Sequence, residues 1–159
     1  MTQKSLSNML KALIIAVALC GVLVYFVALP IIGVDMARQY PEFKHCLPIY
    51  LAFFWLSAVP CYTVLVFSWK TASNIGKDQS FCAANAKNLK IISVLAAADT
   101  AFFFVGNALL LLFRLSHPSI FIFSLLVCFI GLSLTIAFAA LSHLVLKASA
   151  LQEQSDLTI

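Results

Sequence analysis

Four long uncharged stretches dominate the pattern of hydrophobic and polar positions along the chain. They cover residues 12–34, 46–69, 91–113 and 115–146, and the third is interrupted by a single acid, Asp99. A helix needs roughly 20 apolar residues to cross a hydrocarbon layer about 30 Å thick, so each stretch is long enough to span a membrane. The pattern therefore predicts an all-α integral membrane protein, a four-helix bundle in which residues 1–159 form one domain. Because a turn at "SHP" precedes the last helix, the predicted spans are about 12–34, 46–69, 91–113 and 119–146.

Composition supports contact with a lipid bilayer. Of the 159 residues, 63% are hydrophobic and 10% are charged, and the mean hydropathy is +1.04. Soluble domains have roughly 45–50% apolar and about 25% charged residues. We therefore exclude a soluble globular protein and expect lipid to be the main partner of the surface.

Positive charge predicts the orientation of the four helices, because cytoplasmic loops retain Lys and Arg. One predicted side holds seven such residues, namely Lys4, Lys11, Lys70, Lys77, Lys87, Lys90 and Lys147. The other side holds three, Arg38, Lys44 and Arg114. Both termini and a loop over 70–90 are thus expected in the cytoplasm. Although the formal net charge is +4, no basic stripe is interleaved with aromatic residues, so direct nucleic-acid binding is not expected.

Catalytic and metal-binding motifs do not occur in the sequence. We find no H-E-x-x-H, no G-x-S-x-G, no glycine-rich phosphate loop and no paired carboxylates. The five cysteines form no C-x-x-C pair and show no metal-ligand spacing. We expect a protein that is not an enzyme and that has no catalytic residue, cofactor or metal site.

Turn residues predict how the helices begin and end. Gly76 is expected to end a helix in the left-handed conformation. The next helix could run from about 82 to 113 and extend beyond the membrane. Pro118 suits the first position of the last helix, with Ser116 as a plausible cap. A polar loop is expected over 35–45.

Small residues recur along the last span at spacings of three and four. Such a seam lets a neighbouring helix approach closely and exchange hydrogen bonds, although a pore lining is the alternative. The residues of the predicted seam are Ser124, Cys128, Gly131, Thr135, Ala139 and Ser142.

Three consecutive phenylalanines lie in the third span. Phe102, Phe103 and Phe104 are expected to face lipid.

Asp99 is the main candidate for a functional residue. A carboxylate at the centre of a span costs about 2.5–3.5 kcal/mol on insertion scales, so such residues usually face the bundle interior and find a partner. At a similar depth Pro60 leaves the carbonyl of Leu56 without its helical donor. Asp99 is then either a protonated structural group that bonds this carbonyl, Tyr62 or Thr63, or a proton-coupled or ligand-sensing group. The predicted intramembrane polar site comprises Asp99, Pro60, Tyr62, Thr63 and Thr135.

Several stretches resemble a bacterial membrane family called domain of unknown function 2975. They are "GKDQSFCAANAKNLKIIS" (76–93) and "LSHLVLKASALQEQSDLTI" (141–159), together with "ADTAFFFVGN" and "SHP". The resemblance implies four spans in the bacterial cytoplasmic membrane. It also implies a frequent genomic neighbour, a short helix-turn-helix protein of the Cro/repressor type. Cys82 stands where the family usually places the Ser or Thr that could cap the third helix, which weakens that cap.

Two functions follow from these patterns. The leading expectation is that the protein tethers or modulates a small helix-turn-helix regulator at its cytoplasmic face. The alternative is a small oligomeric exporter or channel that uses Asp99 as its coupling group. A homo-oligomer is compatible with both. The predicted partner surface comprises Phe81, Asn85, Leu89, Leu151, Leu157 and Ile159.

Overall fold

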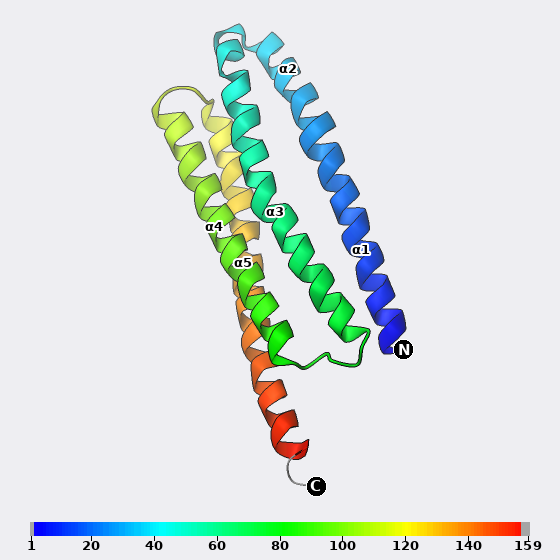
Figure 1. The fold of residues 1–159 in the computed structure, drawn as a ribbon. Coiled ribbons are helices and arrows are strands. Elements are labelled where there is room, and N and C mark those ends of the chain that lie inside the picture. The colour runs from blue at the N-terminus through cyan, green and yellow to red at the C-terminus, as the bar shows by residue number, and fades with distance from the viewer. Residues whose placement is uncertain (1, 157–159) are drawn as a thin grey trace.

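The computed structural model describes residues 2–156, and these residues form helices and turns without a strand. The elements are α1 (Gln3–Leu23), a π-helical turn (Val24–Ala28), α2 (Leu29–Gln39), a 3-10 helix (Pro41–Cys46), α3 (Leu47–Ile75), α4 (Ala83–Leu112) and α5 (Pro118–Asp156). Because α1, the π-helical turn and α2 join end to end, they make one rod beside three other long helices (Figure 1). The all-α fold and its four membrane-length helices are thus confirmed.

The helices are arranged in the order in which they follow one another. The first rod packs on α3, α3 packs on α4, and α4 packs most extensively on α5. Within the described residues α5 has no close backbone contact with α1, α2 or α3. Figure 1 accordingly shows the first rod at one side of the molecule and α5 behind α4. The two termini lie at the same end.

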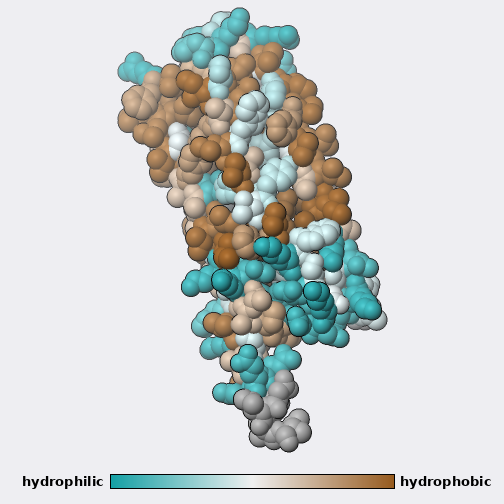
Figure 2. Space-filling view, viewed as in Figure 1, coloured by the Kyte–Doolittle hydropathy of each residue, from teal (hydrophilic) through white to brown (hydrophobic). Residues whose placement is uncertain are grey.

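Large apolar side chains cover the outside of the helices. Ile122 and Phe129 are each 68% exposed, and on the face shown in Figure 2 a broad hydrophobic band lies between polar residues gathered toward the ends. A soluble monomer rarely exposes a contiguous apolar surface of this extent. The band therefore marks the part of the protein that contacts lipid. Beyond it, α5 continues past the other helices at the end that holds the termini (Figures 1 and 2).

The first rod is held to α3 by polar contacts that reach backbone carbonyls. The hydroxyl of Ser7 donates to the carbonyl of Ala72 across 2.7 Å, and the hydroxyl of Tyr62 donates to the carbonyl of Ala18 across 3.0 Å. Glycine permits the second approach, because a Cβ at Gly21 would lie only 2.9 Å from the Tyr62 hydroxyl. These contacts position α1 along α3.

The first rod is longer than the sequence predicted. The expected polar loop at 35–45 was wrong in its first part, because α2 continues to Gln39. Nothing in "DMARQ" breaks a helix, and Asp35 and Arg38 form an ion pair of 3.8 Å on its surface. The helix ends before Tyr40, which precedes Pro41 and has a non-helical backbone (φ −126°, ψ 78°). The residue before a proline is disfavoured in the helical conformation, which explains this boundary.

Two predicted helix-terminal roles were wrong in part. The α3 helix ends at its C-cap Gly76 as predicted, but Gly76 has a right-handed φ of −67°, and Asp78 instead takes the left-handed conformation with φ 63°. Glycine is needed at 76 for another reason, since a Cβ there would lie 2.7 Å from the Ser7 hydroxyl. Pro118 begins α5 as predicted, but its cap is His117: the backbone N–H of Ser119 donates to Nδ1 of His117 across 3.3 Å. The hydroxyl of Ser116 donates to the carbonyl of His117 instead.

Candidate functional site: a polar cluster around Asp99

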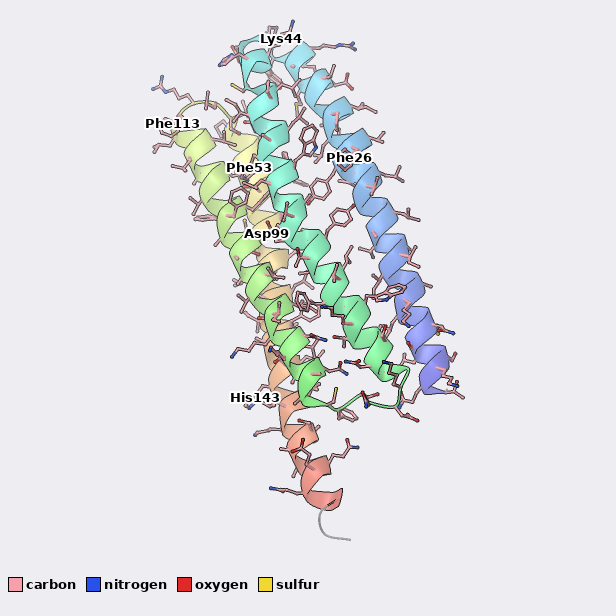
Figure 3. The ribbon with its side chains drawn as sticks, in the orientation of Figure 1. Phe26, Lys44, Phe53, Asp99, Phe113 and His143 are labelled. Atoms are coloured by element: carbon pink, nitrogen blue, oxygen red, sulfur yellow. The ribbon has the colours of Figure 1, made fainter. Side chains whose placement is uncertain are left out.

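Asp99 belongs to the middle of α4, and its side chain lies between α3 and α4 (Figure 3). Its Oδ2 accepts hydrogen bonds from the hydroxyl of Ser57 at 3.3 Å and from the thiol of Cys61 at 3.4 Å. Ser57 and Cys61 are four residues apart on α3, and this spacing places them on one helix face. The α3 helix therefore presents two donors to the single acid of the α4 span.

The first rod adds an aromatic residue to this cluster. The hydroxyl of Tyr25 donates to the Sγ of Cys61 across 3.8 Å. Tyr25 belongs to the π-helical turn, and its carbonyl accepts a hydrogen bond from the indole of Trp55 at 3.1 Å. Short π-helical segments inside α-helices are frequent at functional sites. The first rod, α3 and α4 thus each contribute at least one residue to the polar cluster around Asp99.

One carboxyl oxygen of Asp99 is left over. Oδ1 is buried and has no hydrogen-bond partner among the described residues. A buried polar atom without a partner is unusual in proteins and calls for an explanation. In addition, an ionisable residue inside a membrane span is expensive to bury and usually marks a functional site. Asp99 therefore remains the strongest candidate site in the molecule.

The predicted partners of Asp99 were wrong. Tyr62 donates to Ala18, as described above, and Thr63 donates to the carbonyl of Val59 in its own helix at 2.8 Å. The Leu56 carbonyl freed by Pro60 is not bonded by Asp99 either, since Oδ2 accepts from the other α3 side chains. The reason is helical geometry: each residue turns by about 100°, so Tyr62 and Thr63 point away from the face that carries Cys61.

Thr135 was placed in the same polar site, and this too was wrong. Its hydroxyl donates to the carbonyl of Gly131 at 2.9 Å. Its carbonyl accepts from the hydroxyl of Ser93 at 3.0 Å. Thr135 therefore belongs to the contact between α4 and α5 and not to the cluster around Asp99.

The predicted seam on α5 largely coincides with this contact. Ser124 and Ser142 are buried, and the hydroxyl of Ser142 donates to the carbonyl of Ala86 on α4 at 2.8 Å. A Cβ at Gly131 would collide with the Thr100 side chain, so glycine allows the close approach. Ala139 is exposed and does not belong to the seam. Phe138, one position earlier, packs against the buried core in its place.

The buried core lies near the start of α4 and excludes part of the predicted partner surface. Asn85 is 1% and Leu89 is 6% exposed, so neither can contact a partner in this conformation. Phe81 and Leu151 are exposed as predicted. Leu157 and Ile159, the last two residues of the predicted surface, lie outside the described residues.

An aromatic layer follows the Asp99 cluster toward the end opposite the termini. The ring of Phe53 stacks on Phe102 at 5.0 Å and on Phe103 at 5.5 Å, and Phe54 lies 5.8 Å from Phe103. The expectation that Phe102 and Phe103 face lipid was therefore wrong, whereas Phe104 is 44% exposed. Phe103 lies one helical turn from Asp99, so the aromatic layer borders the polar cluster directly.

The polar cluster offers few metal ligands. Within residues 2–156, no three His, Cys, Asp or Glu side chains gather closely enough to hold a metal ion. The chemistry available at the cluster is therefore hydrogen bonding and proton exchange at one carboxyl, one thiol and two hydroxyls.

Comparison with known proteins agrees with a membrane protein. The family model described as "Protein of unknown function (DUF2975)" matches residues 31–159. Over 125 residues the chain is 23% identical to a Bacillus subtilis (strain 168) protein described as "Uncharacterized membrane protein YoaS". That match covers 77% of this chain and 78% of the relative. No solved structure matches significantly. The chain belongs to the DUF2975 family of membrane proteins.

Proposed function

We propose that this protein is a non-enzymatic small exporter or channel in which Asp99 binds a proton as the coupling group. The observation that carries the proposal is the unpartnered Oδ1 of Asp99 in the middle of the α4 span. Oδ2 is already engaged by Ser57 and Cys61. Oδ1 is therefore the position where a proton, or the cationic group of a substrate, can be added without breaking a contact.

The surroundings of Asp99 favour a response to such binding. The first rod contacts α3 but not α4 or α5 by its backbone, so its position depends mainly on α3. Tyr25 lies on this rod and contacts Cys61, which in turn contacts Asp99. A proton at Asp99 changes the charge at the far end of this chain of contacts. A difference of this kind can shift a protein between two helix arrangements when they bind the proton unequally.

Proton flux tests the proposal in purified full-length protein. The protein is reconstituted in liposomes that contain a pH-sensitive dye, and a pH gradient is applied with ethidium present as the probe cation. We expect a flux that Asp99→Asn abolishes, because the amide keeps the shape but cannot exchange a proton. Asp35→Asn, which changes an exposed acid of α2, is the matched control and should retain the flux. Equal flux in wild type and Asp99→Asn, or none above empty liposomes, would contradict the proposal.

A second function is favoured by the shape of α5. This helix continues to Asp156, beyond the other helices, and exposes 67% of Leu151. Phe81, 57% exposed, lies in the loop at the same end. These two residues could contact a small helix-turn-helix regulator, provided that this end faces the cytoplasm of a bacterium as the distribution of Lys predicts.

Affinity purification tests this tethering function. The full chain and a chain without residues 147–159 are purified from the native membrane, with Leu151→Asp as a milder variant. Recovery of a DNA-binding protein with the full chain alone supports tethering. Equal recovery with all three chains, or recovery with none, argues against it. Reporter fusions within the loop over 76–82 check the orientation on which this function depends.

A further inference from the structure

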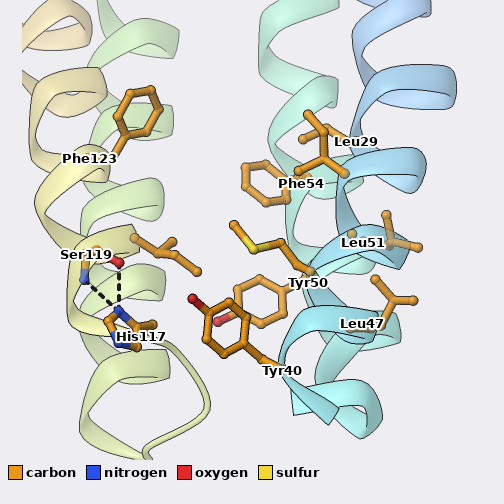
Figure 4. Close-up of a pocket in the computed structure, with 14 residues that line it drawn as sticks. Leu29, Tyr40, Leu47, Tyr50, Leu51, Phe54, His117, Ser119 and Phe123 are labelled. Carbon is orange, nitrogen blue, oxygen red and sulfur yellow. Dashed lines mark hydrogen bonds between the residues drawn. The ribbon is translucent and has the colours of Figure 1, made fainter. Parts of the chain in front are cut away.

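A cavity of about 460 Å³ lies between α2, α3 and the start of α5, at the end opposite the termini (Figure 4). It exists because α5 packs on α4 and leaves a gap toward α2 and α3. Ligand pockets commonly measure about 300–1,000 Å³, so the cavity has the size of a binding site for one small molecule. It is separate from the Asp99 cluster, since Phe54 forms part of its wall and the ring of Phe103 lies 5.8 Å beyond that of Phe54.

The cavity is long and apolar. Its lining on α2 begins at Leu29 and recurs along one helix face to Tyr40. The eleven steps from Leu29 to Tyr40 correspond to a length of about 16 Å at a helical rise of 1.5 Å per residue. Leu51 and Phe123 contribute apolar walls from α3 and α5, and no Asp, Glu, Lys or Arg lines the cavity. Its long direction follows the helix axes, which is also the direction of lipid chains in a bilayer.

Hydrogen-bonding groups gather at one end of the cavity. Tyr40, Tyr50, His117 and Ser119 line this end (Figure 4). The Tyr50 hydroxyl is engaged, because it donates to the carbonyl of Leu115 at 2.8 Å. The rings of Tyr40 and His117 lie 6.1 Å apart.

His117 contacts Ser119 through Nδ1. This nitrogen lies 2.7 Å from the Ser119 hydroxyl and accepts the backbone N–H of Ser119 at 3.3 Å. In the tautomer in which Nδ1 accepts, Nε2 carries the proton and is a donor. A ligand that places an oxygen acceptor at this end would complement His117 and the hydroxyl of Tyr40.

We infer that the cavity binds a single-chain amphiphile, a free long-chain fatty acid, with its carboxyl group at His117 and Tyr40 and its chain along α2. The length and the apolar wall suit one extended chain, and the donors suit a carboxyl oxygen. A water-soluble metabolite would place polar groups against the apolar walls, where the lining offers them no partner. This inference does not depend on the proposed role of Asp99.

Photocrosslinking in nanodiscs tests the inference on the full-length protein. The probe is palmitic acid that carries a diazirine in its chain, and labelled peptides are identified by mass spectrometry. We expect saturable labelling of one probe per chain in residues 29–40 and 117–123. Ala37→Phe fills the cavity and should reduce this labelling at least fivefold. Ala52→Phe adds the same side chain at an exposed position of α3 outside the lining and should leave it unchanged.

Two further variants show whether the labelling depends on His117 and whether it is independent of Asp99. His117→Asp retains an acceptor for Ser119 but loses the donor and adds a negative charge, so it should weaken labelling without loss of the α5 cap. Asp99→Asn should label as wild type does, which separates this site from the proposed proton site. Labelling spread over the lipid-facing residues of α5, or labelling unaffected by Ala37→Phe, would overturn the inference. Equal labelling of the cavity by a diazirine phospholipid would overturn it as well, because the occupant would then be ordinary membrane lipid.

Discussion

The hydroxyl of Ser57 donates to Oδ2 of Asp99 across 3.3 Å and joins a buried residue of α3 to the single acid of the α4 span. Ser57→Ala removes this bond and should destabilise the protein. Hydrogen bonds between membrane helices average about 0.6 kcal/mol and reach about 1.7 kcal/mol. We expect a loss within that range, measured by reversible unfolding in mixed micelles of detergent and denaturing surfactant.

The matched control for Ser57→Ala is Ser133→Ala. Ser133 is exposed, and its hydroxyl donates to the carbonyl of Phe129 in its own helix at 2.8 Å. Its removal should change stability by less than about 0.5 kcal/mol, as at other surface positions. A cycle with Asp99→Leu completes the test: Ser57→Ala should cost less in that background, since the acceptor is gone. Equal costs in both backgrounds would show that the two residues do not interact.

Gly106 makes room for the aromatic layer. A Cβ at this position would collide with the ring of Phe53, which stacks on Phe102 and Phe103. Overpacking of this kind costs about 1–3 kcal/mol, so Gly106→Ala should lower the unfolding free energy by that amount. The double variant with Phe53→Leu should recover part of the loss in the same assay. A loss that Phe53→Leu does not relieve would place the strain elsewhere.

Gly131 has the corresponding role in the contact between α4 and α5. A Cβ here would collide with Thr100 on the facing helix, so Gly131→Ala should also cost about 1–3 kcal/mol. Ala139→Val, on an exposed face of the same helix, should change stability by less than about 0.5 kcal/mol. Thermal unfolding in detergent compares the two variants. If Ala139→Val proved as costly as Gly131→Ala, α5 would have to face α4 by the other side.

The spans could be predicted from the sequence because each depends on local composition alone. An uncharged run such as 91–113 predicts a helix across the bilayer without knowledge of its neighbours. The start of α5 at Pro118 was equally local, since proline suits the first helical position. Gly131 and Ser142 could be assigned to a packing face because small residues repeat along one side of the helix.

The partners of Asp99 could not be predicted, because they depend on how α3 and α4 rotate against each other. Equal depth made Tyr62 and Thr63 as plausible as Ser57 and Cys61, and only packing distinguishes them. The available signal in the sequence is the pair of small polar residues four apart, which places Ser57 and Cys61 on one helix face. The π-helical turn at Tyr25 leaves no comparable pattern. The cavity likewise depends on where α5 lies, which no local pattern specifies.

Asn85 holds the loop between α3 and α4 in place. Its Nδ2 donates to the carbonyls of Gln79 at 2.9 Å and Ser80 at 3.0 Å, and its Oδ1 accepts from Asn74 at 2.8 Å. Because the amide is buried, Asn85→Ala should leave these partners unsatisfied and cost about 1–3 kcal/mol. Faster amide exchange should be confined first to residues 76–82, since this segment loses its anchor.

The control for Asn85→Ala is Lys87→Ala, an exposed change in the same turn of α4 that should preserve the exchange of the loop. The start of α4 offers no substitute anchor, because Cys82 at its N-cap makes no side-chain capping bond. Cys82→Ser supplies the missing cap and should add about 1 kcal/mol of stability in the wild-type background. It should leave the exchange of 76–82 fast in the Asn85→Ala background, because a cap cannot replace the two bonds to Gln79 and Ser80. Slow exchange in that double variant would show that the helix start, rather than the Asn85 amide, orders the loop.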